Sequence, residues 1–228
     1  MIRLENISLS YGSHTILRDV SFHLHAGELC ALVGRNGAGK STLLRALTTN
    51  GSTLLNGTPR FELSPEKMAQ MVAIVTTERI RIENLLVEDL VAMGRAPYTN
   101  WMGRLQDIDH EIVSKAIEAV GMGNFARRDT SSLSDGELQR AMIARAIAQQ
   151  TPIILLDEPT AFLDIPTRFE MCRLLADLAH KEGKAILFST HDVDAALPVC
   201  DSFAIIDNCK LYQLPSNAAA AEIERIFK

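Results

Sequence analysis

The amino-acid sequence predicts an α/β fold: a parallel sheet flanked by helices, with antiparallel strands at the N-terminus and a helical insertion in the middle. Short apolar strand segments alternate with helical segments, which is the pattern of a parallel sheet. Residues 2–25 instead alternate apolar and polar side chains with period two, as antiparallel strands with one wet face do. Residues 80–150 show helical periodicity and no clear strand.

The elements follow in chain order. Antiparallel strands are expected in IRLENISLSYG (2–12) and VSFHLH (20–25), and a buried strand in ELCALVG (28–34) leads to a helix at KSTLLRAL (40–47). Later apolar runs predict the strands MVAIVT (71–76), PIILLD (152–157), AILFST (185–190) and SFAIID (202–207). Helices are expected in VEDLVAMG (87–94), DHEIVSKAIEAVGM (109–122), SDGELQRAMIARAIAQ (134–149), PTRFEMCRLLADLAHKEG (166–183), DVDAALPVC (192–200) and SNAAAAEIERIF (216–227).

Length and composition predict one domain, residues 1–228. We expect an α/β core with its β-subdomain from 1–79 and 150–228, and a helical subdomain from 80–149. The net charge of −5 and the lack of basic runs longer than two residues argue against nucleic-acid partners. No apolar run is long enough for a membrane helix. The scattered cysteines predict buried, reduced thiols and a cytosolic protein: Cys30, Cys172, Cys200 and Cys209.

The segment GRNGAGKS fits the phosphate-binding pattern GxxxxGK[ST] and lies between an apolar strand and a helix, as that loop requires. Its glycines let backbone N–H groups surround phosphates, Lys40 reaches the β- and γ-phosphates, and the Ser41 hydroxyl can bind Mg²⁺. The predicted ATP-binding residues of this loop are Gly34, Asn36, Gly37, Ala38, Gly39, Lys40, Ser41 and Thr42.

The segment IILLDE supplies a second part of a nucleotide site. An apolar strand would deliver Asp157 to the metal, and the adjacent Glu158 could polarise water for attack on the γ-phosphate. Acidic residues often follow a strand without any catalytic role, so this pair alone is weak evidence for a nucleotide site. Together with the phosphate-binding loop it is strong evidence.

The segment LSDGELQR predicts a second helix start suited to an anion. Ser134 can cap the helix and Glu137 stands three residues later, as in a capping box. Two further residues are ambiguous when taken alone. His191 could be a structural histidine or a catalytic one, and Tyr11 could be an ordinary strand aromatic.

Four segments occur in a particular order and spacing: GRNGAGKST, LSDGELQR, IILLDEPTAFLD and STHD. In this order and spacing they resemble the ATP-binding subunit of an ATP-binding cassette (ABC) transporter, and the resemblance runs from about residue 2 to 210. The resemblance implies the ABC ATPase fold with a P-loop NTPase core, with ATP and Mg²⁺ as cofactors. It also implies a head-to-tail homodimer in which Ser134, Gly136 and Glu137 cover the ATP held by the partner.

The resemblance also assigns roles to single residues. Tyr11 corresponds to the aromatic on which adenine stacks, Asp164 to the loop that crosses the dimer, and His191 to the residue that senses the γ-phosphate. Glu158, His191 and Lys40 are the implied catalytic residues, and Ser41 and Asp157 the metal ligands.

The sequence departs from the family pattern at three places. The family glutamine that contacts Mg²⁺ is replaced by Thr77 or Glu78, and of these we favour Thr77 acting through a water. The signature usually reads LSGGQ, so Asp135 and Glu137 are departures from it. Asp135 adds negative charge near a phosphate, which predicts weaker closure of the dimer without loss of function. The link TTNGST is shorter than usual, which indicates either a trimmed β-subdomain or a chain that lacks a few residues.

The region from Val87 to Met122 together with DEPTAFLDIPTRFEMCRLLADLA resembles subunits that drive bacterial import of iron-siderophores, haem or cobalamin. This implies two permease subunits, docked near Thr77–Arg81 and Val87–Trp101, an external substrate-binding protein acting indirectly, and a peripheral place on the cytoplasmic face of the inner membrane. Tyr98 and Trp101 would contact the permease or anchor their own loop. The alternatives are a soluble ABC ATPase acting on proteins or nucleic acid without a permease, and a nucleotide-binding module that no longer hydrolyses ATP.

Overall fold

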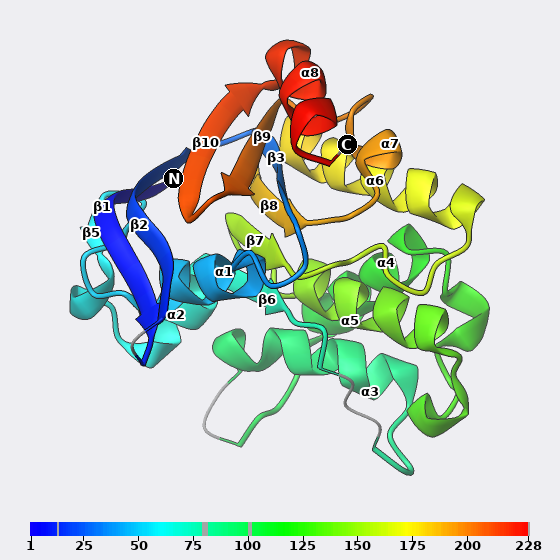
Figure 1. The fold of residues 1–228 in the computed structure, drawn as a ribbon. Helices are drawn as coiled ribbons and strands as arrows, with labels where there is room; N and C mark the ends of the chain where they lie inside the picture. The colour runs from blue at the N-terminus through cyan, green and yellow to red at the C-terminus, as the bar shows by residue number, and fades with distance from the viewer. Residues whose placement is uncertain (13, 79–81, 100–101, 228) are drawn as a thin grey trace.

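The structure is a computed structural model that describes residues 1–12, 14–78, 82–99 and 102–227, with the side chains of Tyr11, His14 and Phe227 outside the description. It contains two sheets with helices between and around them (Figure 1). The antiparallel sheet has the order β2 (His14–Leu24), β1 (Ile2–Tyr11), β4 (Leu54–Leu55), β5 (Thr58–Pro59). The larger sheet has the order β10 (Lys210–Pro215), β9 (Ser202–Asp207), β3 (Leu29–Gly34), β8 (Ala185–Ser189), β7 (Ile153–Leu156), β6 (Val72–Val75).

In the larger sheet β9, β3, β8, β7 and β6 run parallel, and β10 pairs antiparallel with β9 at one edge. The α-helices are α1 (Lys40–Thr49), α2 (Pro65–Met71), α3 (Val87–Ala92), α4 (Asp107–Ala119), α5 (Asp135–Ala148), α6 (Ile165–Glu182), α7 (Val193–Ala196) and α8 (Ser216–Phe227). Short 3₁₀ turns lie at η1 (Arg60–Glu62), η2 (Met93–Tyr98), η3 (Gly123–Phe125) and η4 (Thr130–Ser132). The predicted fold class is confirmed.

The parallel strands are almost continuously apolar because both of their faces are buried. Alternate residues of β3 face opposite sides: Leu29, Ala31 and Val33 belong to the apolar core that also contains the buried residues of helices α3 to α8. Cys30 and Leu32 belong to a second apolar core, which also contains buried residues of α1 and of the antiparallel sheet. Helix α1, which follows the glycine-rich loop, is therefore held between the two sheets (Figure 1).

The predicted strands agree with β6 to β9 to within one or two residues at each end, and the terminal helix is present as α8, with Ile223 and Ile226 buried. The helix expected at 192–200 is wrong in length, since α7 ends at Ala196. Pro198 lies just beyond and has no N–H to continue the helical hydrogen bonds. Strand β10 was not predicted from the sequence.

The cysteines are free, and three of them are buried as expected: Cys30, Cys172 and Cys200. Cys209 is exposed. None of the described helices is both long and apolar enough to cross a membrane. The short link at 48–53 is closed by Arg60, whose Nε donates to the Thr48 carbonyl at 2.8 Å.

A buried ion pair organises the insertion formed by α3, α4 and α5. Arg95 Nε donates to Asp109 Oδ1 at 2.8 Å, and both side chains are about 5% exposed. Arg95 also donates to the Ala148 carbonyl at the end of α5. Its guanidinium lies 4.2 Å from the centre of the Tyr98 ring. One side chain thus connects α4, α5 and the turn after α3. The division of the chain into a core and a helical subdomain stays a prediction.

Candidate functional site

The glycine-rich loop has the backbone geometry of an anion site. Gly37 and Gly39 have φ values of 78° and 107°, in the region that favours glycine. A side chain at Gly39 would also place its Cβ 2.4 Å from Ile16 Cγ2. Gly39 precedes α1 and offers no side-chain cap, so the N–H groups of the first turn have no side chain from the cap position as a partner. These groups are suited to a phosphate.

Lys40 lies under this loop. It is 6% exposed, and its Nζ donates to the carbonyl oxygens of Gly34 at 3.0 Å and Arg35 at 3.4 Å. Burial lowers the pKa of Lys40, while the nearby carboxylates of Glu158 and Asp157 act to raise it. The ammonium group is therefore placed between the loop and two carboxylates, where an incoming polyphosphate would find a positive charge.

Asp157 and Glu158 follow β7 and are held by Ser189, the last residue of the neighbouring strand β8. Ser189 Oγ donates to Asp157 Oδ1 at 2.6 Å and accepts from the Glu158 N–H at 2.9 Å. Glu158 has a φ of 50°, a conformation that a non-glycine residue adopts at some cost. The role of Ser189 was missed at the sequence level, where a serine at the end of a buried strand was the only available signal.

His191 faces Glu158. Its Nε2 lies 2.7 Å from Glu158 Oε1, and the two side chains are 41% and 31% exposed. Because β3, β8 and β7 are adjacent and parallel, the residues that follow them converge at one edge of the sheet. The structure thus brings together four of the predicted site residues: Lys40, Asp157, Glu158 and His191.

A cavity of about 270 Å³ lies beside this group, between α1 and the end of β6. Ser41, Asp157, Thr77 and Glu78 all line it. Among the described residues no cluster of three or more His, Cys, Asp or Glu side chains could hold a metal alone. A hydroxyl and a carboxylate beside a phosphate loop fit Mg²⁺, which prefers oxygen ligands and takes the others from phosphate and water. Both candidates for the glutamine position line the same cavity.

The LSDGELQR segment begins α5 with the predicted capping box. Ser134 Oγ accepts from the Glu137 N–H at 3.3 Å, and Glu137 Oε2 accepts from the Ser134 N–H at 2.7 Å. The backbone hydrogen bond from Ser134 lowers the pKa of Glu137. A Cβ on Gly136 would lie 2.9 Å from the Phe162 carbonyl oxygen, so this helix start packs on the loop that precedes α6. The LSDGELQR segment and the loop that precedes α6 both lie far along the sequence from the loop that carries Lys40.

Asp164 caps α6, since its Oδ1 accepts from the Thr167 N–H at 2.9 Å. Tyr11 ends β1, where its backbone pairs with His14, and its side chain lies outside the described residues. A cavity of about 190 Å³, lined in part by Ile16, Gly37 and Ala38, lies beside the glycine-rich loop.

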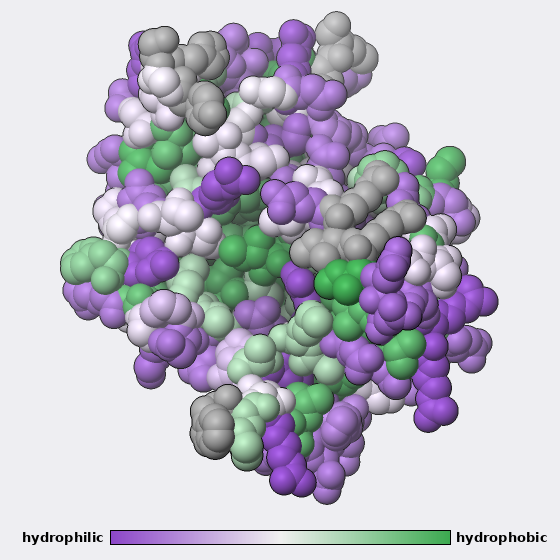
Figure 2. All heavy atoms as spheres, turned by 90° about the horizontal axis from the view of Figure 1, so that it is seen from below, coloured by the Kyte–Doolittle hydropathy of each residue, from purple (hydrophilic) through white to green (hydrophobic). Residues whose placement is uncertain are grey.

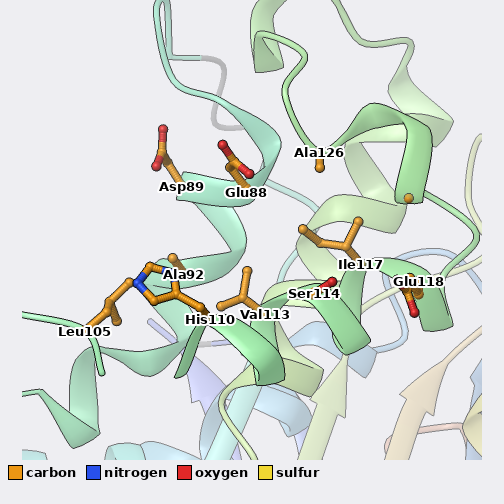
Figure 3. Close-up of a pocket in the computed structure, with 11 residues that line it drawn as sticks. Glu88, Asp89, Ala92, Leu105, His110, Val113, Ser114, Ile117, Glu118 and Ala126 are labelled. Atoms are coloured by element: carbon orange, nitrogen blue, oxygen red, sulfur yellow. The ribbon is translucent and has the colours of Figure 1, made fainter. Parts of the chain in front are cut away.

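The face of the molecule seen from below the view of Figure 1 is hollowed, and hydrophobic residues gather at the centre of the hollow (Figure 2). On the helical insertion a separate pocket of about 350 Å³ lies between α3 and α4. Figure 3 shows the acidic side chains of Glu88 and Asp89 at one end of this pocket and Glu118 at the opposite side, and apolar side chains also line it: Ala92, Val113 and Ile117. Of the residues expected to meet a permease, 79–81 and 100–101, which include Trp101, lie outside the described residues.

The fold and the site together define a class of protein: an ATP-binding, ATP-hydrolysing cassette. The profile of the ABC transporter family matches residues 17–161, and the chain belongs to this family. It is 38% identical to an uncharacterized ABC transporter ATP-binding protein of Methanocaldococcus jannaschii, over 98% of this chain and 79% of that protein. It is 37% identical to a petrobactin import ATP-binding protein of Bacillus anthracis, over 92% of this chain and 79% of that protein.

Solved structures agree with the fold. An ABC transporter described as metal-chelate type, in an inward-facing conformation, matches with a TM-score of 0.83 and 26% identity, over 99% of this chain and 88% of that one. A dimeric ABC transporter cassette matches with a TM-score of 0.84 over 95% of this chain and 99% of that one, and its 24% identity supports the fold alone.

Proposed function

We propose that this chain powers an ABC importer for an iron-siderophore, haem or cobalamin by hydrolysing Mg²⁺-ATP as a homodimer. The names of similar proteins support the cargo class: the petrobactin protein above, and a probable siderophore transport system ATP-binding protein of Bacillus subtilis, 38% identical over 92% of this chain and 78% of that protein. The single observation that carries the ATPase assignment is the convergence of Lys40, Asp157, Glu158 and His191 at one edge of the sheet.

The chemistry follows from these positions. The first-turn N–H groups of α1 and Lys40 would hold the phosphates, and the Ser41 hydroxyl and Asp157 would hold Mg²⁺, which would neutralise phosphate charge. Glu158 accepts a hydrogen bond from the attacking water and orients it. His191 now contacts Glu158, and it would exchange this partner for a γ-phosphate oxygen, which frees the Glu158 carboxylate for water.

The dimer completes each site. In our proposal Ser134, Gly136 and Glu137 of one chain, with the N-terminal dipole of α5, cover the γ-phosphate bound by the other chain. Asp164 lies in the loop that crosses between the two chains. The existing capping box leaves the Ser134 hydroxyl a lone pair and a proton for such a contact. Tyr11 would stack on adenine beside the cavity lined by Ile16.

The Glu158→Gln variant tests this function. It keeps the size of the side chain and removes the water-orienting charge, so ATP binding should persist while hydrolysis falls by about 100-fold or more. Light scattering should then show an ATP-dependent dimer. Glu170→Gln, an exposed change on α6, is the matched control and should hydrolyse ATP like the wild type. A Glu158→Gln chain that binds ATP yet stays monomeric at every concentration would refute the sandwich dimer.

The permease partner and the peripheral membrane location belong to the same proposal. The hollowed face offers apolar surface, and the pocket between α3 and α4 is partly apolar and bordered by the acidic side chains of Glu88, Asp89 and Glu118 (Figures 2 and 3). Tyr98 stacks on Arg95, which favours anchoring of its own loop for that residue. Trp101 is then the better probe. Trp101→Ala should reduce co-purification with a permease without changing ATP affinity, and weakened ATP binding would contradict the assignment.

A further inference from the structure

Arg168, in the first turns of α6, donates hydrogen bonds to two separate parts of the candidate site. Its Nε donates to the Leu163 carbonyl at 2.8 Å, and one terminal nitrogen donates to Asp192 Oδ1 at 2.7 Å. The Arg168 and Asp192 side chains are 34% and 29% exposed, so the pair is partly shielded from water. The planar guanidinium has donors in fixed directions, which suits a contact with two fixed acceptors at once.

The Asp192 end of this contact fixes the backbone next to His191. Asp192 Oδ2 accepts from Thr160 Oγ1 at 3.0 Å, and the Asp192 N–H donates to Thr190 Oγ1 at 2.9 Å. Both carboxylate oxygens are thus used, and the residues on either side of His191 are hydrogen-bonded to their surroundings. Thr160 itself lies two residues after Glu158, so this end connects both members of the His191–Glu158 pair.

The Leu163 end fixes the loop that carries Asp164. Leu163 is buried, whereas the preceding Phe162 has a φ of 66° and is 57% exposed. The Phe162 carbonyl lies against Gly136 at the start of α5. The loop between Glu158 and α6 therefore packs on the start of α5 on one side and is held by Arg168 on the other.

We propose that Arg168 is a positioning residue that couples the Asp164 loop to His191 within one chain. This inference rests on the proposed function, in which Asp164 meets the partner chain and His191 meets the γ-phosphate. Engagement of the loop by the partner moves the Leu163 carbonyl, and Arg168 passes this displacement to Asp192 and the adjacent histidine. Arg168 is not among the residues that hold the phosphates, so its loss should act on turnover rather than on ATP affinity.

A double-mutant cycle between Arg168→Ala and Asp164→Ala tests the coupling. Arg168→Ala should lower kcat by about 10-fold and leave the KM for ATP within about 2-fold, because an interaction used only during turnover is removed. If Arg168 transmits the position of the loop, the double variant should be no slower than the slower single variant. Arg173→Ala, an exposed change on the same helix, is the control and should combine additively with Asp164→Ala.

Three results would overturn the proposal: additive effects of the Arg168 and Asp164 changes, a wild-type kcat in Arg168→Ala, or a rise in KM without a fall in kcat. If Arg168→Ala does not fold, Arg168→Lys, which keeps the charge and contacts only one acceptor, enters the cycle under the same criteria. A wild-type chain without ATPase activity would refute the proposed function instead. The cycle is then read from the dissociation constant of the ATP-dependent dimer.

Discussion

Removing the Ser189 hydroxyl should destabilise the protein more than its size suggests. The hydroxyl is fully buried and serves both the Asp157 carboxylate and the Glu158 N–H. A hydrogen bond to a charged group contributes about 1.5–3 kcal/mol and one to a neutral group about 1 kcal/mol. Ser189→Ala should therefore cost about 3 kcal/mol, which for a chain of this length corresponds to a fall of roughly 6–12 °C in Tm.

Thermal unfolding followed by circular dichroism, without nucleotide or metal, measures this loss. Ser132→Ala is the matched control, because the Ser132 hydroxyl makes one exposed hydrogen bond, to the Asp129 carbonyl at 2.7 Å. That variant should lose about 2 °C or less. If Ser189→Ala unfolds within about 2 °C of Ser132→Ala, the hydroxyl is not a structural partner of the two carboxylate residues and the reasoning fails.

Three further predictions concern other parts of the chain. Thr77→Gln should raise basal ATP hydrolysis several-fold by restoring a direct Mg²⁺ contact, whereas Thr76→Gln should not. If a phosphate-release assay gives equal rates for Thr77→Gln and the wild type, Thr77 does not occupy the place of the family glutamine. Burial raises the pKa of Cys30 and Cys172 to about 12 and that of Cys200 further, so a thiol reagent at neutral pH should modify the native chain at Cys209 alone, as mass spectrometry can check. Hydrogen bonds from the backbone N–H of Gln106 and then from Arg95 lower the pKa of Asp109. The ionised carboxylate therefore stabilises the folded chain above the ordinary carboxyl pKa of about 3.9, and this stabilisation is lost as pH falls toward the lower folded value. The free energy of unfolding of Asp109→Asn, measured with urea, should depend less on pH in that range.

The sequence predicted the central strands well because each is an apolar run bounded by polar or turn residues. Strand β10 was missed for the opposite reason. It lies at the edge of the sheet and its side chains are mostly exposed, so KLYQLP carries little hydrophobic signal. The antiparallel partner β9 determines this strand more than its own residues do.

The phosphate loop, Asp157 and Glu158 could be placed from the sequence because each follows directly from a strand and a local pattern. The contacts of Ser189 and Arg168 could not be placed from the sequence, because their partners are about 20 to 30 residues away along the chain or lie across a loop. Arg95 gives the same lesson, because its partner Asp109 is on another helix and only packing brings the pair together. Tertiary hydrogen bonds of this kind leave no periodicity in a single sequence.

The strand order also bears on how the protein forms during synthesis. The neighbours of β3 are β8 and β9, so a nascent chain that ends before Ala185 has made the phosphate loop but neither strand that pairs with β3. Its antiparallel sheet and most of its helices are already complete by then. We therefore expect ribosome-bound intermediates to acquire much of their secondary structure early and nucleotide affinity only after the segment from Ala185 onward emerges, with the apolar face of β3 available to chaperones in the interval.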